Sequence, residues 1–309
     1  MNLRHFLASP TRTIRWGLQR RVTALPAYQS LTSRGRAMAQ KLKRRLTKPP
    51  LAYLELHLTD HCNMNCCGCG HFSNVASAWY ADPESHNRDM RRLSQLFSNI
   101  SSIHLLGGEP LQHPKVTEFL SSTRRGFPQA VIRLVTNGIL LPSMGQDFWR
   151  CCRANRISIS ITLYPPMLNK EDALRRLVSG ENLELVINKT STFWASLNPK
   201  GDSDPARALR ACRKMYYTPF LREGLLYLCP FSANVPTYNR VFAAQIPEKS
   251  GAIGIHAPGM TGWDVLEFLE RPAEVCRFCS FGTGVRKYDW KRTTKAKEEW
   301  NFDLVPGQE

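Results

Sequence analysis

The chain has 309 residues, 42% of them hydrophobic, so it can bury a sizeable core and is not disordered as a whole. Its net charge of +17 is concentrated at one end. Residues 1–54 carry twelve Lys or Arg and no Asp or Glu, whereas the remainder carries thirty basic and twenty-five acidic residues. The sequence has no run of about 18 apolar residues, which excludes a membrane-spanning helix, and its start lacks the apolar run of a secretory signal.

Residues 1–50 form the first predicted unit, a basic and partly helical arm that ends at Pro49 and Pro50. Its charge is compatible with an anionic membrane surface, a nucleic acid, or contact with solvent alone. Nucleic acid is the weakest of the three, because no aromatic-rich RNA- or DNA-binding module accompanies the charge. An Arg-rich, acid-poor start is also typical of an organelle transit peptide. We expect a cytoplasmic protein without a nucleic-acid partner, peripheral at a membrane through this arm.

Residues 51–204 alternate strand-like apolar runs with helix-like stretches. Strands are expected at 53–58, 103–106, 131–135, 157–163 and 183–187, and helices at about 83–99, 114–125, 143–154 and 169–179. This alternation is typical of parallel βα units, and strands buried on both faces have continuous apolar runs. The sequence therefore predicts an α/β fold, a partial (β/α) TIM-like barrel of five or six parallel strands. In such barrels the chemistry takes place where strands end and loops begin.

The pattern changes after residue 204. Residues 205–284 are rich in Pro and Gly, with a short hairpin expected at 220–229 and a short helix at 263–270. We predict a small cysteine-bearing C-terminal appendage here. A polar tail at 285–309 follows, in which Trp290 and Trp300 are candidate anchors.

Ten cysteines occur, at positions 62, 66, 67, 69, 151, 152, 212, 229, 276 and 279. Disulfide frameworks belong to small secreted chains, so clustered cysteines in a chain of this size favour metal binding. Cys62, Cys66 and Cys69 follow the first predicted strand, with three and then two residues between them. Thiolates at this density bind iron–sulfur clusters or zinc. A closed zinc site needs a fourth ligand, and the adjacent Cys67 is a poor one because neighbouring cysteines rarely point at one metal.

Polar and glycine-rich motifs follow or end the next three predicted strands. They are Gly107-Gly108-Glu109-Pro110, Thr136-Asn137-Gly138, and Ser160 with Thr162. Glycines let a ligand approach the backbone closely, and a carboxylate can receive an ammonium group. Taken singly, each motif also fits a plain turn or an ordinary half-buried strand.

The cysteine loop resembles the C-x3-C-x2-C signature of the radical S-adenosylmethionine (SAM) superfamily, and the Gly-Gly-Glu-Pro motif strengthens the resemblance. It implies a [4Fe-4S] cluster on Cys62, Cys66 and Cys69, whose open iron binds SAM and cleaves it to a 5′-deoxyadenosyl radical. The residues that it implies in SAM binding are Gly107, Gly108, Glu109, Pro110, Thr136, Asn137 and Ser160. Gly68 departs from the pattern, because the superfamily usually has an aromatic residue there that contacts adenine. His71 and Phe72 are the candidate replacements.

A second set of cysteines comprises Cys212, Cys229, Cys276 and Cys279, separated by sixteen, forty-six and two residues. Four thiolates suffice for a four-iron cluster or for a structural zinc. Their spacing resembles the twitch domain, a short form of the SPASM domain, of aminocyclitol dehydrogenases. This resemblance implies a second [4Fe-4S] cluster. The sequence flanking the first cysteine loop is also similar to radical SAM proteins encoded beside polysaccharide glycosyltransferases.

These resemblances imply a reaction at a hydroxyl-bearing carbon of a sugar, cyclitol or glycosylated intermediate, by oxidation or epimerisation. They also imply an electron donor such as flavodoxin or ferredoxin. Cys67 is left over inside the cluster loop, so it is a candidate hydrogen donor; the plainer interpretation is a loop residue that points away from SAM. Two alternatives stay open. One is a peptide or protein maturase; the other is a non-catalytic iron–sulfur or zinc adaptor, which leaves the Gly-Gly-Glu-Pro motif unexplained.

Overall fold

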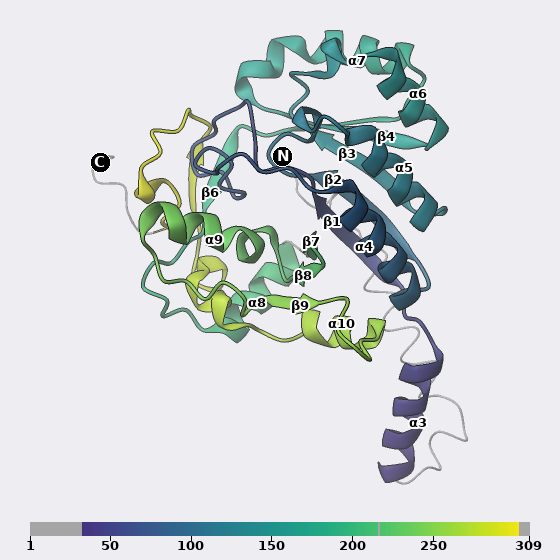
Figure 1. Ribbon diagram of the computed structural model, residues 1–309. Coiled ribbons are helices and arrows are strands. Elements are labelled where there is room, and N and C mark those ends of the chain that lie inside the picture. The colour runs from purple at the N-terminus through teal and green to yellow at the C-terminus, as the bar shows by residue number, and fades with distance from the viewer. Residues whose placement is uncertain (1–32, 216, 303–309) are drawn as a thin grey trace.

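The computed structural model describes residues 33–215 and 217–302 (Figure 1). Within these residues, eight strands form one sheet in the order β5-β4-β3-β2-β1-β7-β8-β9. They are β1 Leu51–His57, β2 Ile100–Leu106, β3 Val131–Thr136, β4 Ile157–Leu163, β5 Leu185–Lys189, β7 Phe220–Arg222, β8 Leu225–Tyr227 and β9 Ala252–Gly254. The strands from β5 to β7 in this order are all parallel. The predicted α/β fold with five or six parallel strands is therefore confirmed.

Helices cover one face of the parallel part of the sheet (Figure 1). They are α4 Pro83–Leu96, α5 Val116–Gly126, α6 Gln146–Ala154 and α7 Glu171–Gly180. Helix α4 begins at Pro83 because the Asp82 carboxylate accepts a hydrogen bond from the Ser85 backbone N–H, which caps the first turn. Every second strand residue, such as Leu54 and Ile103, is buried beneath these helices in the main hydrophobic core.

Residues 205–284 share the main sheet with the barrel instead of forming a sheet of their own. The expected hairpin is present as β7 and β8, joined by Glu223 and Gly224. Both turn residues have positive φ, 49° and 73°, as a two-residue hairpin turn requires. The segment also contributes three helices and two short 3-10 turns. These are α8 Pro205–Met215, α9 Pro230–Phe242, α10 Gly262–Leu269, η5 Glu274–Phe278 and η6 Ser280–Gly282.

The described part of the tail is folded and contacts distant parts of the chain. Strand β10, Arg286–Asp289, pairs antiparallel with β6, Thr192–Ala195. The short turn η7, Lys297–Glu299, leads into Trp300, which is 4% exposed in a second small core that also contains Phe72. Trp300 is thus the anchor that the sequence indicated. Residues 303–309 lie outside the described residues.

The basic arm is described from residue 33 onward, so its first 32 residues lie outside the described part. Helix α3, Ser33–Leu46, projects away from the body (Figure 1). Its last turns contact α10, where Arg44 Nη1 lies 2.6 Å from Glu267 Oε2 and Lys43 Nζ lies 5.4 Å from the centroid of the Trp263 ring. Among the described helices, none has the length and apolar character needed to cross a membrane.

The remaining 3-10 turns follow the strands of the barrel. They are η2 Pro110–Gln112, η3 Leu141–Ser143 and η4 Pro165–Lys170. Each starts within a few residues of the carboxyl end of its strand, at the edge where the sequence placed the functional motifs.

Candidate functional site

The first cysteine loop follows β1 directly, at the carboxyl edge of the sheet. Burial, followed by the proximity of Cys69, raises the pKa of Cys62 to about 12. Burial also raises the pKa of Cys66 to about 11, against the opposing effect of a hydrogen bond from the Trp290 indole N–H. The three thiols therefore lie within each other's electrostatic reach. Positive charge from bound iron is what would hold them as thiolates.

The two glycines of the Gly-Gly-Glu-Pro motif allow a close approach, but of the chain's own backbone. A Cβ atom on Gly107 would lie 2.4 Å from the Thr59 carbonyl oxygen, and one on Gly108 would lie 1.9 Å from the His61 carbonyl oxygen. The Gly108 N–H donates to the Thr59 carbonyl at 2.7 Å. These glycines thus fix the start of the cysteine loop against the end of β2. Whether SAM also approaches them stays a prediction.

Glu109 joins the ends of β2 and β3. Its carboxylate is fully buried and accepts hydrogen bonds from the Thr136 hydroxyl at 2.7 Å, the Asn137 N–H at 2.8 Å and the Leu111 N–H at 3.1 Å. Burial raises the pKa of Glu109 to about 7 despite these bonds. A carboxylate offers about four acceptor positions, so three of them are taken within the protein. The structure brings these motif residues together around the loop, and their contact with SAM stays a prediction.

Asn137 connects this edge to the cysteines. Its side-chain amide donates to Asn63 Oδ1 at 2.7 Å, and Nδ2 lies 3.9 Å from Cys62 Sγ. Ser160 is buried on β4 beside Val135 of β3. Both residues were expected near SAM, and the structure places Asn137 directly beside the loop.

The second cysteine set converges from three separate segments of the chain. Cys212 lies on α8, Cys229 precedes α9, and the last two lie in and just after η5. Burial, with an added effect of neighbouring cysteines, raises the pKa of Cys276 to about 11 and of Cys279 to about 12. Burial and the other three thiols likewise raise the pKa of Cys212. All four thiols therefore lie within electrostatic reach of one another.

Among the described residues, no three His, Cys, Asp or Glu side chains lie close enough together to hold a single ion. In a four-iron cluster each thiolate binds a different iron, so a wider spacing of the thiols is compatible with such a cluster.

The two aromatic replacements expected for Gly68, His71 and Phe72, pack against other parts of the chain. Phe72 is 1% exposed in the second core, where it packs against Tyr238 and Trp300. His71 stacks on His57, with ring centroids 5.8 Å apart. The space beside Gly68 is occupied by the Tyr288 hydroxyl, and a contact of His71 or Phe72 with adenine stays a prediction.

Cys67 is packed against the tail. It is 3% exposed, and burial, followed by the nearby Glu299 carboxylate, raises its pKa to about 11. This position favours the plainer interpretation, a loop residue that packs against its own chain. Hydrogen donation by Cys67 stays a prediction.

A buried ion pair that the sequence did not reveal ties β7 to the cysteine loop. Arg222 donates two hydrogen bonds to the Asp60 carboxylate, at 2.8 and 2.9 Å, and its guanidinium lies 4.1 Å from the centroid of the Trp79 ring. His57 Nε2 lies 2.6 Å from Asp60 Oδ1. Although burial alone would raise it, the pKa of Asp60 is lowered to about 2 by the hydrogen bonds from His57 and Arg222.

The face of the sheet opposite the helices, called here the inner face, carries polar side chains. Alternate strand residues fill the core beneath the helices, so those between them point to the inner face. Its polar members are Tyr53, Glu55, His57, His104, Arg133, Ser158, Ser160, Thr162 and Arg222. Leu106, Val135 and Phe220 also lie on this face, in a small apolar cluster with Tyr227 and Ala233. Glu55 accepts a hydrogen bond from the Tyr53 hydroxyl at 2.7 Å, and that hydroxyl lies 2.8 Å from His104 Nδ1. Burial raises the pKa of Glu55 to about 7.

The inner face also reaches the second cysteine set. Burial raises the pKa of Cys229, and the nearby Glu55 carboxylate adds to the effect. The charge of Glu55, a polar member of the inner face, is thus within electrostatic reach of Cys229.

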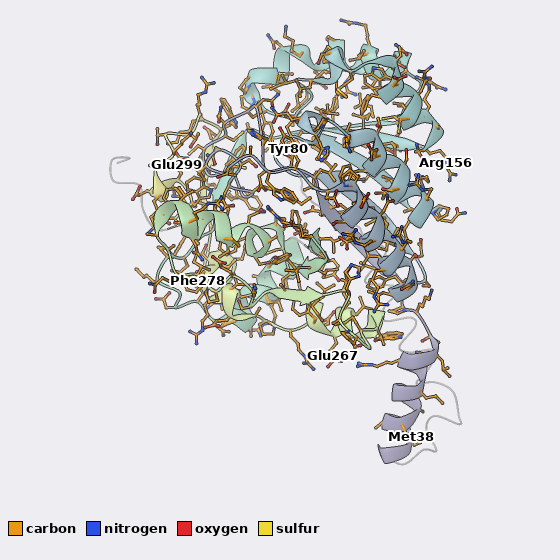
Figure 2. The ribbon with its side chains drawn as sticks, viewed as in Figure 1. Met38, Tyr80, Arg156, Glu267, Phe278 and Glu299 are labelled. Carbon is orange, nitrogen blue, oxygen red and sulfur yellow. The ribbon has the colours of Figure 1, made fainter. Side chains whose placement is uncertain are left out.

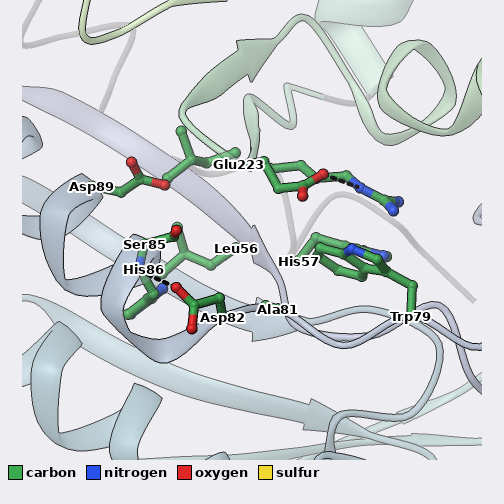
Figure 3. Close-up of a pocket in the computed structure, with 11 residues that line it drawn as sticks. Leu56, His57, Trp79, Ala81, Asp82, Ser85, His86, Asp89 and Glu223 are labelled. Atoms are coloured by element: carbon green, nitrogen blue, oxygen red, sulfur yellow. Dashed lines mark hydrogen bonds and ion pairs between the residues drawn. The ribbon is translucent and has the colours of Figure 1, made fainter.

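The structure also has a small pocket, which His57 and Arg222 help to line. It is lined by residues of α4, β1 and β7, among them Ser85, Asp89 and Glu223, and also by Trp79 (Figure 3). No cysteine lines it, so this pocket is not the site that the motifs indicate.

A cysteine loop after β1 and a Gly-Gly-Glu turn after β2, on a parallel α/β sheet, are the features of a radical SAM protein. Sequence similarity to known proteins supports the radical SAM resemblance, which is the one that implies SAM and a [4Fe-4S] cluster.

The relatives that carry this similarity are cyclases. The chain is 34% identical to GTP 3′,8-cyclase of Geobacter sulfurreducens over 113 residues, which cover 35% of this chain and 33% of the relative. It is 26% identical to GTP 3′,8-cyclase of Clostridium acetobutylicum over 143 residues, covering 45% and 42%. The chain therefore matches between a third and about two fifths of the length of these curated relatives. No family model matches the chain.

Among solved structures, the chain is similar to BtrN in complex with AdoMet and 2-DOIA. The alignment has a TM-score of 0.46 and 14% identity, and it covers 84% of this chain and 100% of that one. Native anSMEcpe with bound AdoMet aligns with a TM-score of 0.37 and 16% identity, covering 56% and 52%.

Proposed function

We propose that this protein is a radical SAM oxidoreductase that acts on a hydroxyl-bearing carbon of a sugar, cyclitol or glycosylated intermediate. The observation that carries the proposal is the set of polar side chains on the inner face, which includes His57 at the end of β1 and Glu55 within electrostatic reach of Cys229. Hydroxyl-rich substrates need such hydrogen-bonding groups to replace their water, whereas an apolar barrel interior would reject them.

The residues that hold the cofactors follow from the two cysteine sets. Cys62, Cys66 and Cys69 would bind the SAM cluster, and Asn137 would orient the loop through Asn63. The four later cysteines would bind a second [4Fe-4S] cluster. When bound, these groups would supply a 5′-deoxyadenosyl radical that removes a hydrogen atom from the substrate, and an acceptor for the electron left behind.

Glu55 is the side chain that we assign to take the hydroxyl proton. It lies on the inner face close to Cys229, and its pKa of about 7 lets it be a carboxylate in a large fraction of molecules at neutral pH. Its acceptor oxygen is held in place by Tyr53, which His104 contacts in turn. Loss of one hydrogen atom, one proton and one electron from the H–C–O–H group leaves a ketone.

Dehydrogenation is favoured over epimerisation. An epimerase must return a hydrogen atom to the opposite face of the carbon, and the leftover cysteine of the loop, Cys67, is buried against the tail. An external reductant such as flavodoxin or ferredoxin would supply the electron that starts each turnover.

A second candidate function is cyclisation of a nucleotide. It is favoured by the similarity to GTP 3′,8-cyclases, although the chain matches less than half of their length. The two candidates differ in substrate, so one assay separates them.

The test is anaerobic turnover of the reconstituted chain with sugar, cyclitol and sugar-nucleotide substrates, and separately with GTP. We expect about eight irons per chain, the sum of two four-iron clusters, and 5′-deoxyadenosine formation that depends on Cys62, Cys66 and Cys69. Changing Cys276 and Cys279 to Ala should spare SAM cleavage and abolish ketone formation. Zinc in place of iron, with no SAM cleavage, would establish the adaptor alternative; turnover of GTP alone would establish the cyclase.

A further inference from the structure

The C-terminal segment 288–300 contacts each residue of the cluster loop from 65 to 69. The Thr293 N–H donates to the Asn65 carbonyl at 3.0 Å, and Arg292 forms an antiparallel bridge with Cys66. The further contacts, in loop order, are Trp290 Nε1 to Cys66 Sγ at 3.1 Å, the Cys67 N–H to the Lys291 carbonyl at 2.9 Å, Tyr288 Oη to the Cys67 carbonyl at 3.1 Å, the Gly68 N–H to Glu299 Oε2 at 3.3 Å, and Trp300 Nε1 to the Cys69 carbonyl at 2.8 Å.

Gly68 fits this segment because it has no side chain. Its φ is +57°, and a Cβ atom would lie 1.9 Å from Tyr288 Oη and 2.8 Å from the Glu299 carbonyl oxygen. Any other residue would be strained and would also displace the tail. Gly68, where the superfamily usually has an aromatic residue, thus lies against an aromatic residue from the tail, Tyr288, 220 positions later in the chain.

The segment is fixed at both ends, so these contacts are not those of a loose terminus. On one side β10 pairs with β6, and the backbone N–H of Trp290 donates to the Ser191 carbonyl at 2.6 Å. On the other side the Trp300 ring is buried in the second core against Phe72 and Phe242.

We infer that residues 288–300 are a built part of the cluster site, a clasp that holds the loop in place and tunes the first cluster through Trp290. The tuning follows from charge. The indole N–H lies 3.1 Å from Cys66 Sγ, and a hydrogen bond to a ligating thiolate stabilises the more negative, reduced state of the cluster. Trp290 is therefore a positioning residue that makes the cluster easier to reduce. The inference rests on the proposed role of Cys66 as a cluster ligand.

The test compares the reduction potential of the SAM-sensitive cluster in the reconstituted full-length protein and in Trp290→Phe, by redox titration followed by electron paramagnetic resonance. Phenylalanine keeps an aromatic ring but has no N–H, so we expect unchanged iron content and a more negative potential. Trp263→Phe is the matched control, because its indole donates to Thr47 beside α3, and its potential should equal that of the parent.

A second pair of variants tests the clasp without relying on the potential. Gly68→Ala should lower the iron retained during exposure to a chelator, and adding Tyr288→Phe should restore part of it by removing the hydroxyl at 1.9 Å. An unchanged potential in iron-replete Trp290→Phe would overturn the tuning role, as would loss of its iron. Full iron retention in Gly68→Ala would overturn the clasp. A parent protein that binds no iron would instead refute the proposed function, and the inference with it.

Discussion

Glu55 is a carboxylic acid that the fold buries on the inner face of the sheet. Its pKa is raised from 4.5 to about 7 by burial, because the charged form loses its hydration and the Tyr53 hydrogen bond replaces only part of it. The unfolded chain releases this proton near pH 4.5 and the folded chain near pH 7. The free energy of unfolding therefore falls by about 3 kcal/mol as the pH rises between these values, and it stays lower at higher pH.

Glu55→Gln should remove this pH dependence. Glutamine keeps an acceptor oxygen for Tyr53 but cannot ionise, so we expect the variant to unfold at a higher temperature than the parent at about pH 8. At about pH 5 the two should unfold together in anaerobic calorimetry. The exposed Glu118→Gln is the matched control and should show no such difference. Destabilisation at both pH values would contradict a buried neutral carboxyl. If Glu55 also accepts the substrate proton, ketone formation falls while 5′-deoxyadenosine is still released.

Residue types were easier to predict from the sequence than their partners. Gly107 and Gly108 were expected to let a ligand approach, and a close approach does occur, but the atoms that come close belong to Thr59 and His61. Glu109 was expected to receive an ammonium group, and it receives hydrogen bonds from three groups of its own chain. A motif shows that a position is sterically or electrostatically special. It does not show which distant atoms make it so.

Arg222 and Asp60 join two elements that are 162 residues apart in the sequence. The pair links β7, the sixth parallel strand, to the first residues of the cysteine loop. Both side chains are largely buried, 14% and 6% exposed, so the loss of one partner leaves a charge in a site of low polarity.

Arg222→Met should therefore destabilise the fold by about 3 kcal/mol, because Asp60 keeps its burial and loses the two hydrogen bonds from its cationic partner. The measurement is the midpoint of denaturant unfolding under anaerobic conditions. Arg175→Ala, which breaks an exposed pair with Glu171 on α7, is the control and should cost less than about 0.5 kcal/mol. Adding Asp60→Asn to Arg222→Met should recover part of the loss. Equal unfolding midpoints for Arg222→Met and the control would show that the buried pair contributes nothing.

Elements with a local signal were predictable, and those that depend on distant pairing were not. Strands β1 to β4 were expected within a few residues of their bounds, because each contains an apolar or alternating run between helix-like stretches. Strands β6 and β10 have only four residues each and are largely polar or half-buried, so neither stands out from a loop. They form because Thr192–Ala195 finds Arg286–Asp289 far along the chain. The pairing of the polar tail was not predictable for the same reason, whereas its tryptophans were candidate anchors.

The described part of the molecule has a compact body and one helix, α3, that projects from it. Its apolar side chains Met38, Leu42 and Leu46 are four residues apart and thus lie along one side of the helix, and they are 76%, 57% and 73% exposed. Met38 extends into solvent near the far end of the helix (Figure 2). The sequence of α3 also carries six Lys or Arg and no acidic residue. An apolar stripe on a basic helix matches an anionic bilayer surface, where the stripe enters the interface and the cations meet the headgroups.

We expect the full-length protein to sediment with phosphatidylserine-containing vesicles at low salt and to ignore pure phosphatidylcholine vesicles. Removing residues 1–45 should abolish this binding, because each basic residue near the surface contributes about 1 kcal/mol to the binding free energy. Changing Met38, Leu42 and Leu46 to Ser leaves the charge intact, so the salt dependence should persist while the affinity falls. Leu168→Ser, an exposed apolar residue on η4, is the matched control and should bind like the parent. Nucleic-acid binding would depend on the cations and not on the apolar stripe. If the parent and the triple variant both ignored anionic vesicles but bound RNA or DNA equally well, the partner of this arm would be a nucleic acid and not a membrane.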